Sequence, residues 1–92
     1  MPKKAREVAA VLQTKGFVET TNAHKRYVLW ANGRKTLIYT EISHGEKEIR
    51  NHMLGVMARQ LRISRSQLMD LVDCRLTEPT YVKILQEGGH IE

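Results

Sequence analysis

Apolar residues recur at helical spacing near the start of the chain. Ala5, Val8, Ala9 and Leu12 fall on one side of a helical wheel between Lys3 and Lys15, and charged residues occupy the other side. Gly16 follows where a helix C-cap is expected. The pattern then changes to that of a strand from Phe17 to Thr21. We therefore expect an amphipathic helix followed by a β-strand.

Two further strands are predicted on either side of Asn32-Gly33. Asn-Gly supplies the two positive φ angles of a tight type I′ turn, and β-branched and aromatic residues flank it. If residues 31–34 form the turn, His24 faces Glu41, so a base lies beside an orienting carboxylate. The same register pairs Arg26 with Tyr39 and Val28 with Leu37. A turn one residue longer would give His24 a different neighbour.

The helical period returns in the second half of the chain. Its apolar positions are Met53, Leu54, Val56, Met57 and Leu61. Ser43 and Glu46 have capping-box spacing, but Asn51 is also a good N-cap. We favour a start at Asn51, with residues 44–50 as a loop. Gly55 inside this helix indicates a close contact with another helix.

Two shorter helices are expected near the C-terminus. Ser64 and Gln67 have capping-box spacing and precede the apolar residues Leu68, Met69, Leu71 and Val72. Thr77-Glu78-Pro79 begins the last helix, and Gly88-Gly89 ends it. Its apolar side consists of Tyr81, Val82, Ile84 and Leu85.

These elements predict the α+β class, with a three-stranded antiparallel sheet packed on helices and a C-terminal helical extension. We divide the chain into a domain over residues 1–72 and an extension over residues 73–92. Because an isolated short helix does not keep an apolar stripe in water without cost, the extension should pack on the same domain or on a partner. A second copy of the chain is one such partner.

Composition restricts the kind of site that the chain can form. Its 92 residues, 41% apolar and 27% charged, fit one small soluble domain with a shallow site. Cys74 is the single cysteine and is interpreted as a small apolar residue in a reducing compartment. No signal peptide or membrane span is recognisable, so we expect a cytoplasmic protein. No metal or cofactor is expected, because His24, His44 and His52 lack a recognised ligand spacing.

Positive charge is concentrated in the first two thirds of the chain. Residues 1–65 contain thirteen Lys and Arg against five acidic residues, whereas residues 66–92 contain two against five. A basic surface of this kind suits a polyanion, most simply nucleic acid, although a solvated basic surface that aids solubility is an equal alternative.

An ordered series of short motifs resembles the HicA family of toxins. The series contains Gly16-Phe17, His24 with Tyr27, Asn32-Gly33-Arg34, His44-Gly45 with Lys47-Glu48-Ile49, Leu54, and Arg59-Gln60-Leu61-Arg62-Ile63-Ser64. The resemblance implies the α-β-β-β-α fold of double-stranded-RNA-binding domains, the order that periodicity also predicts. It further implies cleavage of messenger RNA, with His24 at the position of the catalytic histidine, and a HicB-like antitoxin as partner. The chain departs from the family at Asn22-Ala23, where Gly-Ser is common.

The expected chemistry is metal-independent RNA cleavage. His24 would accept the proton of a ribose 2′-hydroxyl, which then attacks the adjacent phosphate. His44 is a candidate accessory residue, as is Glu41, whereas His52 and His90 are interpreted as surface residues. The residues expected to hold the phosphates are Lys25, Arg26, Arg34 and Lys35.

The aromatic residues Tyr27, Trp30 and Tyr39 could stack on bases, but we expect at least two of them in the core, because the chain has only five aromatic residues. Two other functions remain open at this point: a noncatalytic RNA-binding module of the same fold, and a basic domain that binds only a protein partner.

Overall fold

The main sheet is antiparallel and three-stranded. A computed structural model describes residues 3–21, 24–43, 45 and 47–91. The strands follow the order β2 (Phe17–Thr21), β3 (Lys25–Ala31) and β4 (Arg34–Ile42). Asn32 and Gly33 both have positive φ, as the predicted tight turn between β3 and β4 requires.

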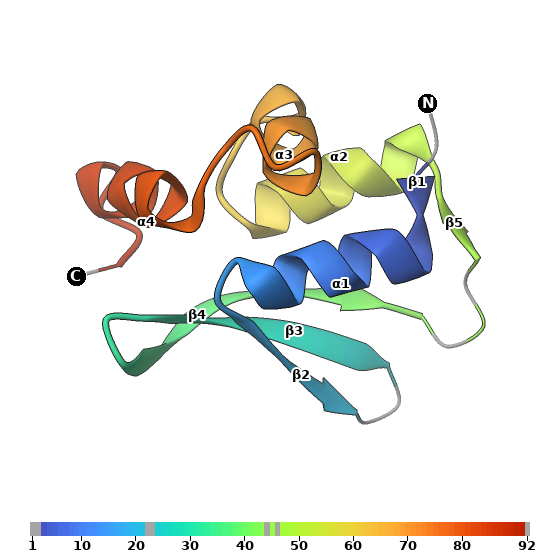
Figure 1. The fold of residues 1–92 in the computed structure, drawn as a ribbon, viewed down its shortest axis with the longest axis horizontal. Helices are drawn as coiled ribbons and strands as arrows, with labels where there is room; N and C mark the ends of the chain where they lie inside the picture. Colours follow the sequence, from blue (N-terminus) through green and yellow to red (C-terminus); the bar gives the residue numbers. More distant parts are fainter. Residues whose placement is uncertain (1–2, 22–23, 44, 46, 92) are drawn as a thin grey trace.

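The described residues form four helices, which lie on one side of this sheet (Figure 1). They are α1 (Ala5–Thr14), α2 (Asn51–Gln60), α3 (Arg65–Val72) and α4 (Glu78–Glu87). Figure 1 shows α1 and α2 above the sheet, α3 beside α2, and α4 above the end of the sheet that carries the β3–β4 turn. The expected α+β class with its three-stranded sheet is therefore confirmed.

The helix boundaries follow the capping signals closely. Ser64 and Gln67 form the predicted capping box of α3, and the Thr77 hydroxyl accepts a hydrogen bond from the Thr80 N–H at the start of α4. The start of α2 differs by one residue, because Arg50 is the N-cap and Asn51 is the first helical residue. The prediction of Asn51 as the N-cap was wrong.

A second small sheet was not predicted. β1 (Lys3–Lys4) pairs with β5 (Glu48–Ile49) where a helix start and a loop were expected. The Ala5 N–H also donates to the Lys47 carbonyl oxygen at 2.9 Å. This pairing ties the start of α1 to the segment that precedes α2.

The predicted register between β3 and β4 is correct at the turn and wrong beyond it. Ala31 faces Arg34, but Val28 faces Tyr39 and Arg26 faces Glu41. Leu29 faces three residues of β4, because the Thr36 hydroxyl donates to the Leu29 carbonyl at 2.8 Å and accepts from the Ile38 N–H. Glu41 is therefore not the cross-strand neighbour of His24.

The core fills the space between the sheet and the helices. Alternate strand residues point into it, including Phe17, Tyr27, Leu29, Ile38 and Ile42. The helices contribute Val8, Leu12, Leu54, Met57, Leu68 and Leu71. Because the register shift on β4 amounts to two residues, the β4 residues from Tyr39 to Ile42 lie on the same face of the sheet as in the predicted register.

Helix α4 is part of the same core. Tyr81 and Leu85 have no exposed surface, and the Tyr81 ring stacks on Phe17 with 6.0 Å between the ring centroids. The Tyr81 hydroxyl donates to the Leu61 carbonyl at 2.9 Å. The apolar stripe of the C-terminal extension thus packs on the domain of its own chain.

Two glycines should respond in opposite ways to replacement by alanine. At Gly16 the φ angle is +94°, and an added Cβ would lie 2.5 Å from Glu78 Oε2, so Gly16→Ala should destabilise the fold by about 1–3 kcal/mol. At Gly55, where a close helix contact was expected, no atom lies within 4 Å of an added Cβ. Gly55→Ala should therefore stabilise the fold by about 0.5–1 kcal/mol.

Urea unfolding followed by circular dichroism measures both changes. A loss of stability in Gly55→Ala would show that helix α2 has a closer neighbour than this packing allows. An unchanged Gly16→Ala would show that the connection between α1 and β2 does not require the left-handed backbone conformation at Gly16.

Candidate nucleic-acid interface

His24 lies at the end of the sheet where β3 begins and β4 ends. Its side chain is exposed, and Lys25 and Arg26 follow it as the first residues of β3. Helices α1 and α2 also begin at this end of the domain (Figure 1), and helix N-termini carry partial positive charge. The histidine is therefore accessible to a ligand and lies beside the positive charges of Lys25 and Arg26.

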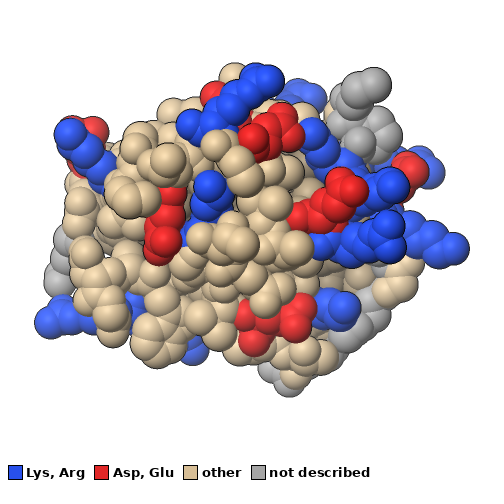
Figure 2. Space-filling view, in the orientation of Figure 1, with Lys and Arg blue, Asp and Glu red and all other residues tan. Residues whose placement is uncertain are grey.

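Further basic side chains gather at the same end. Lys4, Arg6 and Lys47 line a shallow hollow of about 420 Å³, together with Glu48. Figure 2 shows Lys and Arg side chains projecting from this end of the domain, with acidic side chains among them. Lys3 forms an ion pair with Asp73, with 2.8 Å between Nζ and Oδ1. This bond lowers the pKa of the Asp73 carboxyl.

Glu41 is bound to Arg26. Arg26 Nε and Nη2 both donate to Glu41 Oε2, at 3.1 and 3.0 Å. The guanidinium also lies over the ring of Tyr39, with its Cζ 4.6 Å from the ring centroid. Glu41 thus holds the planar guanidinium of Arg26 against the sheet. It does not lie opposite His24, where it was expected.

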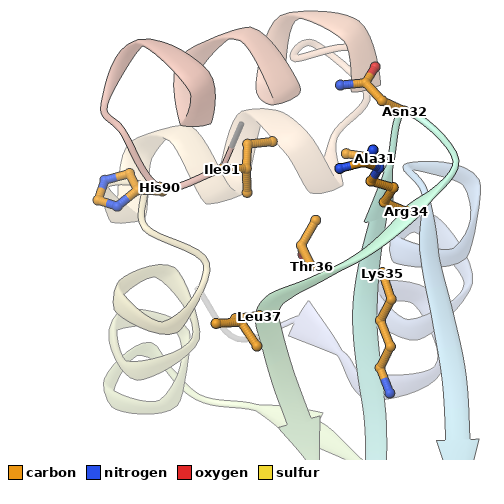
Figure 3. Close-up of a pocket in the computed structure, with 8 residues that line it drawn as sticks. All are labelled: Ala31, Asn32, Arg34, Lys35, Thr36, Leu37, His90 and Ile91. Atoms are coloured by element: carbon orange, nitrogen blue, oxygen red, sulfur yellow. The ribbon is translucent and has the colours of Figure 1, made fainter.

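Arg34 and Lys35 lie at the opposite end of the sheet. The length of β3 places them roughly 20 Å from Lys25, so the four cations chosen from the sequence form two separate pairs. Arg34 and Lys35 line a cleft of about 610 Å³ between the β3–β4 turn and the segment of His90 and Ile91 (Figure 3). In Figure 3 the Lys35 side chain extends away from this cleft along the strands.

The aromatic residues are distributed differently from the prediction. Only Tyr27 is in the core, where its hydroxyl donates to Glu19 Oε1 at 2.7 Å. Burial and this bond raise the pKa of the Tyr27 phenol. Trp30 and Tyr39 are 43% and 40% exposed, on the side of the sheet that faces away from the helices. The expectation that two of the three rings are core residues was wrong.

A small apolar cleft lies between the end of β4 and the start of α2. It has a volume of about 220 Å³, with Ile42, Ile49, Met53 and Met57 among its walls and Ser43, Arg50 and His52 at its polar edge. From the sequence, His52 was interpreted as a surface residue with no role in a site. The residues of this cleft come from separate segments, so no sequence spacing could have identified it.

Other expectations concern the loops and metal binding. His44 and Asn22-Ala23 lie outside the described residues. Cys74, interpreted from the sequence as a small apolar residue, is exposed. Within the described ranges, no group of three His, Cys, Asp or Glu side chains is arranged to hold a metal ion. In the same ranges, no helix has the length and apolar character to span a bilayer.

The comparisons with known proteins give no relative. The chain matches no protein-family model, and searches of curated proteins and of solved structures found no match to it. Function is therefore inferred from the residues and from their arrangement.

Proposed function

We propose that this chain is a HicA-like toxin that cleaves messenger RNA in the cytoplasm. The observation that supports this most strongly is the exposed His24, followed directly by Lys25 and Arg26 at the end of the sheet where two helices begin. The α-β-β-β-α order of the main elements is compatible with a domain of the double-stranded-RNA-binding type. The motif resemblance assigns the catalytic position to His24.

In the proposed reaction, neutral His24 accepts the proton of a ribose 2′-hydroxyl. The 2′-oxygen bonds to the adjacent phosphorus, and the bond from phosphorus to the 5′-oxygen of the next nucleotide breaks. The leaving oxygen takes a proton from solvent or from the protonated histidine, which gives a 2′,3′-cyclic phosphate and a 5′-hydroxyl. Such positioned proton transfer is worth about 10²- to 10⁴-fold in rate, and Lys25 offsets the phosphate charge.

Removing the imidazole should slow cleavage strongly and keep the fold. His24→Ala should cleave labelled single-stranded RNA at least about a hundredfold more slowly in the presence of chelator. The fold should persist, because His24 is exposed and precedes the strand. Glu41→Gln is the matched control, and it should slow the reaction far less because Glu41 bonds to Arg26.

Equal rates for His24→Ala and the wild type would show that the catalytic assignment is wrong. If neither protein cleaves RNA and both bind it, the second candidate function becomes the better one. This is a noncatalytic RNA-binding module, which the lack of a Glu41 partner for His24 favours.

The proposed HicB-like antitoxin should carry an acidic contact surface. It would cover the end with His24, because the basic side chains Lys4, Arg6, Lys25 and Lys47 gather there and opposite charges favour association. We expect the affinity to fall as salt increases and RNA cleavage to stop in the complex. Both can be measured with a co-purified complex. A partner that contacts only residues 66–92 and leaves cleavage intact would contradict this assignment.

A further inference from the structure

The side of the main sheet that faces away from the helices carries no described helix (Figure 1). We call it the open face and define it by Val18, Val28, Trp30 and Tyr39. Val18, Trp30 and Tyr39 are 47%, 43% and 40% exposed around the buried Val28, and Trp30 is the only tryptophan of the chain. Contiguous apolar and aromatic surface of this kind usually marks a binding site.

Flat side chains follow one another along the open face. Tyr39 faces Val28, and Trp30 lies two residues further along β3, so the two rings are diagonal neighbours about 7–8 Å apart at their Cα atoms. On the other side of Tyr39, Arg26 places its guanidinium over the phenol ring, held there by Glu41. Aromatic rings and guanidinium planes are the groups on which proteins stack unpaired bases.

The charges of the open face suit a polyanion. Lys35 faces Trp30 at one end of the open face and Arg26 lies toward the other end, while Lys25 alternates to the helix side of the sheet, opposite Ile42, at the end close to His24. The acidic residue Glu41 also lies on the open face, where its charge is offset by that of Arg26. The distance along β3 from Trp30 to His24 is roughly 20 Å, which is enough for a few nucleotides of an extended strand.

The open face is small for a protein partner. Three strands spaced about 4.8 Å apart and roughly 20 Å long cover on the order of 300 Å². A stable protein interface needs about 800 Å² from each partner. A second copy of the chain would therefore need contacts beyond this face, whereas a stacked strand of RNA would not.

We propose that the open face binds single-stranded RNA. Unpaired bases stack on Trp30 and on the Arg26–Tyr39 pair, Lys35 contacts a phosphate, and the strand continues to His24 at the end of the sheet. This inference rests on the proposed RNA-cleaving function and defines its substrate as single-stranded. A duplex does not fit, because its bases are paired and stacked on one another.

The test measures binding and cleavage separately. All proteins carry His24→Ala, so that the labelled polyuridine strand remains intact, and binding is followed by fluorescence anisotropy. Trp30→Leu keeps apolar bulk without a ring and should weaken binding about 5- to 150-fold, the loss expected for one stacked base. Trp30→Phe is the matched control and should recover most of the affinity. In the protein with Trp30 intact, the strand should quench the tryptophan fluorescence.

A second pair of variants covers a failure of Trp30→Leu to fold. Tyr39→Leu should weaken binding and Tyr39→Phe should bind almost normally, with folding of each variant checked by its melting curve. Binding by Trp30→Leu as tight as that of Trp30→Phe would overturn the inference. Tighter binding of duplex RNA would also overturn it. A dimer that dissociates on Val18→Asp would do the same, because the open face would then be a protein interface.

The failures of the two proposals are distinguishable. If the protein with native His24 cleaves RNA and the Trp30→Leu change does not affect binding, the proposed function stands and the open-face inference fails. If Trp30→Leu weakens binding but the protein with native His24 never cleaves RNA, the open face binds RNA and the catalytic proposal fails.

Discussion

All the helices of the described chain lie on one side of the β2–β3–β4 sheet, so each strand gives alternate side chains to the core and the others to water. The inward-facing side chains beneath α1 and α2 include Tyr27, Leu29 and Ile42. The same alternation directs Trp30 and Tyr39 outward. Helix α4 completes the core through Tyr81 and does not cross to the other side. One-sided burial therefore both stabilises the domain and creates its exposed aromatic surface.

The same arrangement brings positive charge and His24 to one end. The start of β3, the end of β4 and the first turns of α1 and α2 lie at that end, and the β1–β5 pair fixes the start of α1. The cations at the β3–β4 turn lie at the far end and cannot act on the same phosphate as Lys25. A ligand that uses both groups has to extend along the sheet. This geometry favours an extended strand over a compact anion.

Much of the fold could be predicted from residues with strong local preferences. Asn32-Gly33 determined the turn, and Ser64 with Gln67 determined the start of α3. The register further along β4 could not be predicted. It depends on the hydrogen bond that the Thr36 hydroxyl of β4 donates to the Leu29 carbonyl of β3. The two-residue strands β1 and β5 are too short to show a period. His24 could be chosen from the sequence, whereas its separation from Glu41 required the register.

The central claim is that the chain cleaves RNA through the ribose 2′-hydroxyl. The most direct measurement incubates the purified protein, with chelator, with one RNA strand and with the same strand carrying a single 2′-deoxy nucleotide at the cleavage position. Our account predicts cleavage of the first strand to a 2′,3′-cyclic phosphate and no cleavage of the second at that position. Equal cleavage of both strands, or of neither, would contradict it.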